Sequence, residues 1–327
     1  MTDAIAARIS GLNVEYALKG GLLQPHRTVK AVQDVSFELR QGEILALVGE
    51  SGCGKSSLGK AILRLVEPKS GQIEIAGLDF RSLRGSALRK HRSLVQMIFQ
   101  DPYASLDPRM TVWDILAEPL QAHNFYSKAE LQKRIDQALE LVGLPLQHAR
   151  RYPHEFSGGQ RQRIAIARAL ILQPKVIIAD EPVSSLDVSV QAQILNLLKD
   201  IQQKLNLSLI FISHNLAVVK YLADRIGVMY LGRLVEIGSR EEIFTSPKHP
   251  YTQALLSAVP IPDPRKERAR PHNPLKGEIP SPVNPPAGCA FHTRCPIAMD
   301  VCKQKAPQLV VTEGSTQRTA CWAVHPN

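Results

Sequence analysis

Short apolar runs recur along this chain, separated by stretches whose apolar residues fall at helical spacing. Three of the runs, at residues 44–48, 175–179 and 208–213, have the length of buried strands. The stretch from Val190 to Leu205 carries its apolar residues on one helical face. Such alternation is typical of a parallel sheet with helices on its faces. We therefore predict an α/β fold.

The pattern changes in three other places. Residues 8–39 alternate apolar and polar residues as strands do, around an exposed loop at residues 19–26. From about residue 101 to 156 the spacing is helical without strong strands, which predicts a helical insertion. Residues 260–286 contain nine prolines and predict an extended arm between the main domain and the C-terminal residues.

A glycine-rich stretch directly follows the apolar run at residues 44–48. Residues 49–56 read Gly-Glu-Ser-Gly-Cys-Gly-Lys-Ser, and a helical pattern begins at Ser57. Backbone N–H groups of such a loop, together with the helix N-terminus, bind phosphate. Lys55 is then expected to reach the β- and γ-phosphates and Ser56 to bind Mg²⁺. The stretch predicts a nucleotide site.

Polar residues follow the ends of other apolar strands. Gln100 follows Phe99, the Asp180-Glu181 pair follows Ala179, and His214 follows Ser213. Because ligands of open parallel sheets bind at the carboxyl ends of the strands, we expect these side chains to converge on the phosphates. Asp180 would hold Mg²⁺ with Ser56 and Gln100. Glu181 would be the base for the attacking water, assisted by Gln100 and His214.

The composition narrows the classes of partner and location but does not identify the function. The 327 residues carry 40 Lys and Arg against 30 Asp and Glu, a net charge of +10 that suits nucleic acid, an anionic membrane surface or a nucleotide. The first ten residues lack the apolar core of a signal peptide, and no apolar run approaches membrane-spanning length. We expect any work at a membrane to be done from outside the bilayer.

The order of these motifs resembles the ATP-binding cassette of ABC transporters, over roughly residues 8–245. Phe156-Ser157-Gly158-Gly159-Gln160 is similar to the family signature, with Phe where Leu is commoner, and Ser185-Leu186-Asp187 follows the Asp-Glu pair. The resemblance implies a P-loop NTPase fold with an N-terminal antiparallel β subdomain and a helical subdomain at about 101–156. It also implies that two cassettes sandwich two nucleotides, with the signature and Asp187 facing the ATP of the other cassette. The residues expected to bind nucleotide are Tyr16, Gly49, Ser51, Gly52, Cys53, Gly54, Lys55, Ser56, Ser57, Ser157, Gly158, Gly159, Gln160 and Asp187.

Tyr16 enters that set only by the resemblance, as an aromatic ring that stacks on adenine. Its position alone fits an ordinary aromatic residue at a strand end equally well. Asn215, after His214, stands where Asp is more usual in the family, and we expect little consequence.

The remaining residues, 246–327, resemble the C-terminal extension of dipeptide and oligopeptide importer ATPases, and most the dipeptide-type second ATPase subunit. The resemblance rests on residues 249–256, 277–282 and 288–295. It implies an ATPase that powers import of peptides, or of a related solute such as nickel, from the cytoplasmic face of the inner membrane. Its implied partners are a second ATPase subunit, in a homodimer or heterodimer, two membrane-spanning permease subunits and an extracytoplasmic solute-binding protein.

Four cysteines form the last motif, at gaps of five, six and eighteen residues: Cys289, Cys295, Cys302 and Cys321. Structural zinc sites favour tighter pairs, and four thiolates in a small segment suit an iron–sulfur cluster. The segment resembles the tail of relatives that carry a [4Fe–4S] cluster. We therefore predict such a cluster, with zinc and free thiols as alternatives.

A cassette ATPase acting on nucleic acid is the alternative function. Chromosome-type relatives insert long coiled coils, but Ser157 follows Gln100 by only 57 positions. Ribosome-type relatives carry two cassettes in one chain. We therefore favour the transporter and expect no nucleic-acid partner.

Overall fold

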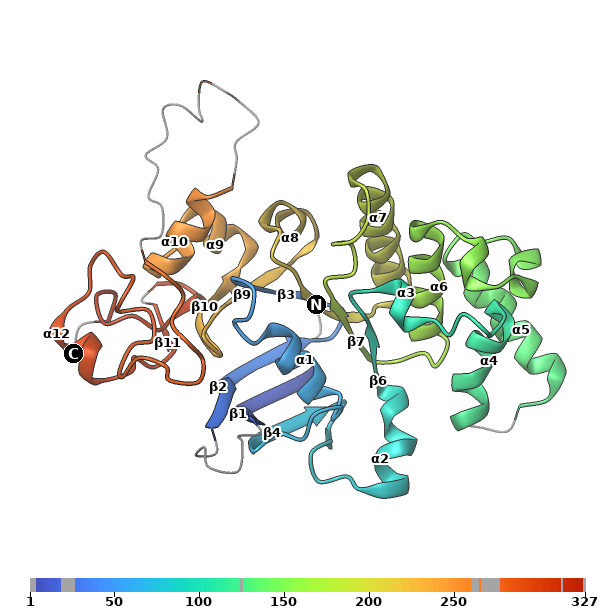
Figure 1. Ribbon diagram of the computed structural model, residues 1–327, viewed down its shortest axis with the longest axis horizontal. Coiled ribbons are helices and arrows are strands. Elements are labelled where there is room, and N and C mark those ends of the chain that lie inside the picture. The colour runs from blue at the N-terminus through green and yellow to red at the C-terminus, as the bar shows by residue number, and fades with distance from the viewer. Residues whose placement is uncertain are drawn as a thin grey trace. The chain divides into compact units, whose positions relative to one another are not determined.

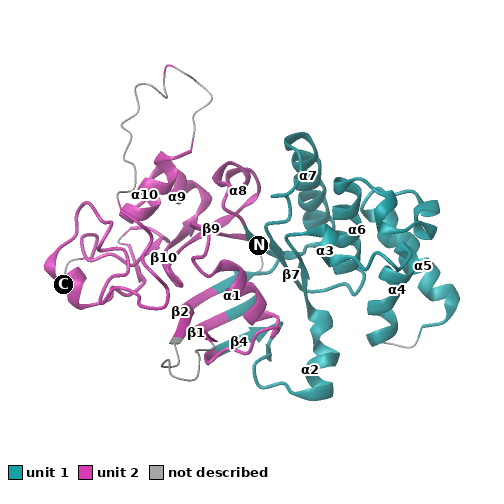
Figure 2. Ribbon diagram, viewed as in Figure 1, with its two compact units in different colours: residues 1–8, 38–44, 72–212 teal, residues 9–37, 45–71, 213–327 magenta. Residues whose placement is uncertain are grey.

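The computed structural model describes residues 4–18, 27–123, 126–259, 265, 277–312 and 314–325. The predicted loop at residues 19–26 and much of the proline-rich stretch lie outside these residues. The chain divides into two compact units, shown in Figure 2. Unit 1 comprises Met1–Arg8, Glu38–Ile44 and Gln72–Ile212, and unit 2 comprises Ile9–Phe37, Leu45–Gly71 and Ser213–Asn327.

The predicted N-terminal antiparallel sheet is present and contributes residues to both units. Its strands have the order β2-β1-β4-β5 and the bounds Ile5–Leu18 (β1), Arg27–Arg40 (β2), Ser70–Ile75 (β4) and Leu78–Asp79 (β5). Alternate residues such as Leu12 and Val14 are fully buried, which explains the period of two in the sequence. Gly71 has φ 102°, and a Cβ there would lie 2.6 Å from the Gly11 carbonyl oxygen. Only glycine fits this close approach.

Unit 1 contains a parallel sheet of order β8-β7-β6. The bounds are Val95–Ile98 (β6), Val176–Asp180 (β7) and Ser208–Ile212 (β8). The strands predicted at residues 175–179 and 208–213 are therefore confirmed to within one residue. Every residue of β7 and β8 is buried, so both strands appear in the sequence as continuous apolar runs.

Unit 1 also contains most of the longer helices of the chain (Figure 1). Its helices are α2 (Gly85–His91), α3 (Pro102–Ser105), α4 (Val112–His123), α5 (Lys128–Leu141), α6 (Gly158–Leu170) and α7 (Val188–Leu205), with short 3₁₀ turns at Arg92–Leu94, Leu146–Arg150 and Pro153–Glu155. Helices α3, α4, α5 and α7 all contact α6. Helix α6 follows the helical insertion predicted at about residues 101–156 and packs against its helices α3, α4 and α5.

Unit 2 is organised around a second run of strands. From Leu45 onward β3 (Ile44–Val48) runs parallel to β9 (Arg225–Tyr230), which pairs antiparallel with β10 (Arg233–Ser239). Two short strands, β12 (Arg318–Thr319) and β11 (Val310–Val311), continue this sheet beyond β10. The last part of the chain therefore adds strands next to β10 in unit 2.

The helices of unit 2 are short. They are α1 (Lys55–Ile62), α8 (Leu216–Leu222), α9 (Arg240–Thr245), α10 (Pro250–Ser257) and α12 (Asp300–Gln304). Among the described residues, no helix combines the length and the apolar composition that crossing a bilayer requires.

Candidate active site

The loop at residues 49–54 connects β3 to α1, as the sequence predicts. Gly49 has φ 152° and Gly54, the residue before α1, has φ 103°. A Cβ would lie 2.2 Å from the Met229 carbonyl oxygen at Gly49, and 2.1 Å from that of Ala31 at Gly54. Both positions therefore need glycine for its conformation and for its lack of a side chain.

Lys55 begins α1 and is almost completely buried. Its Nζ donates to the carbonyl oxygens of Gly49, at 2.8 Å, and Glu50, at 3.0 Å. The ammonium group thus lies inside the curve of the loop, where a cation stabilises a bound phosphate. Ser56 and Ser57 follow in the first turn of α1, where the helix dipole favours an anion.

Cys53 directly precedes Gly54 in this loop and is 4% exposed. Burial raises the pKa of its thiol, while the nearby Lys55 ammonium acts in the opposite direction. Its carbonyl oxygen accepts a 2.8 Å hydrogen bond from the Gly232 amide. Cys53 therefore helps to fix the loop through its backbone, and its thiol accepts a 3.5 Å contact from Lys55 Nζ.

His214 and Tyr16 belong to unit 2, as the loop does. The Ser213 amide donates to the Leu47 carbonyl oxygen of β3, at 3.2 Å. The next residue, the exposed His214, therefore follows a residue bound to the strand that leads into the loop. Asn215 caps α8 by accepting from the amides of Ala217 and Val218. Because Asn and Asp are equally good caps, this explains why Asn fits where Asp is usual. Tyr16 lies near the end of β1 and is half-buried.

The polar residues at the strand ends of unit 1 form a pair. The Gln100 side-chain amide donates a 3.1 Å hydrogen bond to the Glu181 carboxylate. Asp180 is the buried last residue of β7, and Glu181 follows with φ 46°, a left-handed conformation uncommon for a residue with a side chain. Its amide donates to the Ile212 carbonyl oxygen at 2.9 Å. The chain thus turns sharply where the sequence places the catalytic carboxylate.

The signature begins helix α6. Ser157 is the N-cap, its hydroxyl accepting from the Gln160 amide while the Gln160 side chain accepts from the Ser157 amide. A Cβ on Gly159 would lie 2.5 Å from Val190 of α7, so small residues here allow the two helices to approach closely. Asp187 is the residue immediately before α7. The helix N-terminus and the small residues together are suited to bind an anion.

The predicted residues divide between the two units. Unit 2 holds the loop at 49–57 with His214 and Tyr16, and unit 1 holds Gln100, Asp180 and Glu181, the signature and Asp187. Convergence of the two sets on one nucleotide remains a prediction.

The four C-terminal cysteines are half-buried or buried in unit 2. Burial raises the pKa values of the Cys289, Cys295 and Cys321 thiols, and the neighbouring cysteines raise them further. The pKa of Cys289 rises to about 11. However, within the described ranges no three His, Cys, Asp or Glu side chains are arranged to hold a metal ion. The structure therefore does not support the predicted cluster.

Comparison with known proteins places the chain in a family. Residues 32–184 match the ABC transporter family, and residues 235–302 match the C-terminal region of oligopeptide/dipeptide transporters. The chain is 51% identical, over 327 residues, to the oligopeptide transport ATP-binding protein OppF of Salmonella typhimurium, covering 98% of this chain and 97% of that protein. It belongs to the ABC transporter family. AppF of Bacillus subtilis, another oligopeptide transport ATP-binding protein, is 52% identical over 295 residues and 90% of either chain.

Solved structures confirm the fold of this ABC transporter ATPase. The structure of cbiO1 from Clostridium perfringens, part of the transporter complex cbiONQ, is similar with a TM-score of 0.63 at 28% identity, covering 74% of this chain and 92% of that one. The dimeric post-hydrolysis structure of the cassette MJ0796 with ADP and Pi has a TM-score of 0.63 at 27% identity, covering 72% and 98%. The predicted cassette fold and ATPase activity are confirmed, and ATP and Mg²⁺ are its expected cofactors. The nucleic-acid alternative gains no support.

The sequence did not predict the contacts that hold Glu50 of the loop to two residues near the C-terminus. Glu50 forms an ion pair with Arg294, at 2.7 Å, and its amide donates to the Tyr251 hydroxyl at 2.9 Å. Both partners lie in stretches that carry the resemblance to importer ATPases, but no pattern links them to a loop about two hundred positions earlier.

Proposed function

We propose that this ABC ATPase powers the import of peptides, or of a related small solute, through a membrane-spanning permease. The observation that carries the proposal is the match of residues 235–302 to the oligopeptide/dipeptide transporter C-terminal region, on a chain whose cassette motifs are intact. The named functions of OppF and AppF, both oligopeptide transport proteins, support it.

In the proposed mechanism the loop at residues 49–57 binds the triphosphate. Lys55 neutralises charge on the β- and γ-phosphates, and the amides at the start of α1 donate to them. Ser56, Gln100 and Asp180 are the residues that would hold Mg²⁺, which neutralises charge that develops on the phosphate oxygens. These hydroxyl, amide and carboxylate oxygens are the donors that this hard cation prefers.

Glu181 is the proposed general base. It accepts a proton from the water whose oxygen attacks the γ-phosphorus, and the bond between that phosphorus and the leaving ADP oxygen breaks. The Gln100 amide, 3.1 Å from the carboxylate, holds Glu181 and provides a contact to the same region. His214 is proposed to donate to a γ-phosphate oxygen, and Tyr16 to stack on adenine.

Two cassettes are proposed to close on each other, with Ser157, Gly158, Gly159 and Gln160 at the nucleotide of the opposite subunit and Asp187 in the interface. The capped N-terminus of α6 supports an anion site there. Val188, next to Asp187, is 82% exposed, as expected for an apolar residue that a second subunit covers. The dimeric state of the MJ0796 cassette also supports this arrangement. We propose that the second cassette is a sister ATPase.

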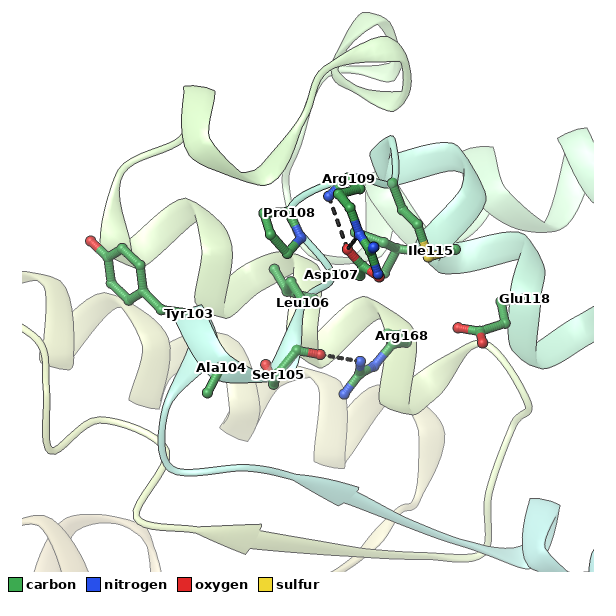
Figure 3. A pocket seen from close by; sticks show the side chains of 11 residues that line it. Tyr103, Ala104, Ser105, Leu106, Asp107, Pro108, Arg109, Ile115, Glu118 and Arg168 are labelled. Carbon is green, nitrogen blue, oxygen red and sulfur yellow. Dashed lines mark hydrogen bonds and ion pairs between the residues drawn. The ribbon is translucent and has the colours of Figure 1, made fainter.

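A pocket in unit 1 is the proposed contact with a permease subunit (Figure 3). Its volume is about 690 Å³, and residues 103–110 line one side. Arg168 of α6 donates to the Ser105 carbonyl oxygen, and the guanidinium of Arg161 lies 4.0 Å from the centre of the Tyr103 ring. The lining segment therefore follows Gln100 and is held by the helix that starts at Ser157. A protein segment bound here would act on both motifs, as coupling of transport to hydrolysis requires.

The proposed location is the cytoplasmic face of the inner membrane, with two permease subunits and an extracytoplasmic solute-binding protein. We also retain the iron–sulfur cluster as a proposal, supported by the neighbouring cysteine side chains that help to raise the pKa values of Cys289, Cys295 and Cys321. No step of the ATPase mechanism involves it.

The test is purification of the tagged full chain from native membranes in mild detergent, with identification of the partners by mass spectrometry. We expect two membrane-spanning subunits and a second ATPase, and ATP hydrolysis stimulated by peptide and the binding protein. A chain that purifies without membrane proteins, or whose activity in the complex ignores every peptide tested while responding to another solute class, would refute the peptide assignment.

A further inference from the structure

The loop that binds phosphate in the proposed function is held by the C-terminal part of the chain. The Arg294 guanidinium forms two parallel hydrogen bonds to the Glu50 carboxylate, at 2.7 and 3.1 Å. Glu50 directly follows the first glycine of the loop, whereas Arg294 lies 244 positions later, next to Cys295. All these residues belong to unit 2.

Burial makes this ion pair unlike a surface salt bridge. The Arg294 side chain is 5% exposed and that of Glu50 is 23% exposed. The guanidinium carbon also lies 5.9 Å from the centre of the buried Tyr230 ring. A bidentate pair in such surroundings has a fixed geometry, and removal of one partner leaves the other charge buried without compensation.

A second contact holds the backbone of the same residue. The Glu50 amide donates to the hydroxyl of Tyr251, which is completely buried in α10. The rings of Tyr230, Tyr251 and Phe291 pack against one another with centroid distances of 4.7, 5.2 and 5.4 Å. Phe291 lies three positions before Arg294, so one aromatic cluster supports both groups that hold Glu50.

The position of a carboxylate here requires an explanation. A negative charge in a phosphate-binding loop repels the triphosphate unless it is neutralised and directed away from the ligand. Arg294 supplies the opposite charge and holds both carboxylate oxygens. The Lys55 ammonium, which donates to the Glu50 carbonyl oxygen at 3.0 Å, depends on the same stretch of backbone.

We propose that Arg294 is a positioning residue for ATP binding, which neutralises Glu50 and, with Tyr251, sets the shape of the phosphate loop from the C-terminal extension. The proposal rests on the assignment of residues 49–57 to the phosphates. It gives the extension a role at the nucleotide site that requires no metal and no redox chemistry.

The test measures the binding of a fluorescent ATP analogue to the full chain. Arg294→Met is expected to weaken binding at least about tenfold, because Glu50 keeps an uncompensated charge beside the phosphates. Glu50→Gln removes that charge, so the double variant Arg294→Met/Glu50→Gln is expected to recover most of the affinity. Lys303→Met is the matched control, since it removes one positive charge from the same segment, where Lys303 pairs with the exposed Asp300.

Several outcomes overturn the proposal. Wild-type affinity in Arg294→Met, or a double variant no better than Arg294→Met, shows that Arg294 does not act through Glu50. In the transporter complex the KM for ATP is expected to rise with little change in kcat, because the reacting groups remain in place; a fall in kcat alone contradicts the positioning role. Should Arg294→Met fail to fold, Arg294→Lys serves instead. It keeps the charge and loses the paired geometry, so affinity equal to wild type refutes the need for that geometry.

The variant Lys55→Ala distinguishes a failure of the Arg294 proposal from a failure of the phosphate-loop assignment on which it rests. Unchanged nucleotide binding in Lys55→Ala would refute the phosphate-loop assignment itself. Lost binding in Lys55→Ala together with normal binding in Arg294→Met would refute only the role of Arg294.

Discussion

The Gln100 side-chain amide lies 3.1 Å from the carboxylate of Glu181, although 81 positions separate the two residues in the chain. Parallel pairing of β6 with β7 places Ile98 opposite Ala179, so both strands end at the same edge. The residue pair therefore follows directly from the register of two buried strands. It joins the proposed catalytic base to the segment that leads into the helical part of unit 1.

Replacement of this base gives the first prediction. Glu181→Gln is expected to lower the rate of ATP hydrolysis by about 10²- to 10⁴-fold, because the proton acceptor is lost. ATP binding is expected to remain, since the phosphate contacts come from residues 49–57. Steady-state phosphate release and titration with a fluorescent ATP analogue measure the two effects. Wild-type turnover in this variant would exclude Glu181 as the base.

The sequence was sufficient for this edge of the sheet because the signals are local. Strands β3, β7 and β8 are buried on both faces and appear as apolar runs, and each is followed by a polar residue or a glycine-rich loop. The family motifs then assign a chemical role to each of those residues.

The hairpin of β9 and β10 was not predicted. A fully buried carboxylate, Glu236, interrupts its apolar pattern. The structure satisfies it with the amides of Lys248 and His249, at 2.6 and 3.2 Å, and with the Gln317 side chain, at 2.5 Å. Burial raises the pKa of Glu236, while these hydrogen bonds oppose the rise. Partners this distant in the chain leave no spacing that a single sequence reveals, and the Glu50–Arg294 pair escaped prediction for the same reason.

The signature helix gives the second prediction. Ser157→Arg is expected to leave ATP binding to the isolated chain intact and to reduce hydrolysis in the two-cassette complex, because a bulky side chain at the start of α6 blocks close approach to a phosphate. Ser127→Arg is the matched control, since the exposed Ser127 caps α5 with the same reciprocal pair of hydrogen bonds. Both variants lose a helix cap, which costs about 1 kcal/mol of stability. Equal hydrolysis by the two complexes would mean that Ser157 acts only as a cap.

The third prediction concerns Glu242, the carboxylate that ties α9 to residues 315 and 316. Burial acts to raise its pKa, but hydrogen bonds from Ser315, Ser239 and Thr316 outweigh burial and lower the pKa from 4.5 to about 2. A carboxyl group with a lower pKa in the folded state stabilises that state above its unfolded pKa. This contribution is lost as the pH falls from about 4.5 towards 2.

Glu242→Gln is therefore expected to lower the free energy of unfolding at pH 7, with a difference from wild type that shrinks below pH 4.5. Urea unfolding at pH 7, 4.5 and 3 measures it. Glu241→Gln, at the exposed neighbouring position, is the control and is expected to change little. If Glu242→Gln lowered the free energy of unfolding by the same amount at every pH, the ionised carboxylate of Glu242 would not be the source of the stabilisation.

The last prediction concerns the metal content of the cysteine segment, where the structure and the family resemblance differ. The described side chains form no metal-binding group, and burial keeps the Cys289 thiol protonated at neutral pH, with a pKa of about 11. Binding of a cluster would therefore have to release protons and draw the four thiols closer together. If this occurs, protein purified without oxygen is expected to be brown, with iron and sulfide in about equal amounts. Cys295→Ser is expected to bleach it, while Cys53→Ser, which changes the remaining cysteine of the chain, keeps the iron. Colourless anaerobic protein with one zinc ion, or with no metal, would remove the cluster and leave the contact of Arg294 with Glu50 as the role of this segment that the structure supports.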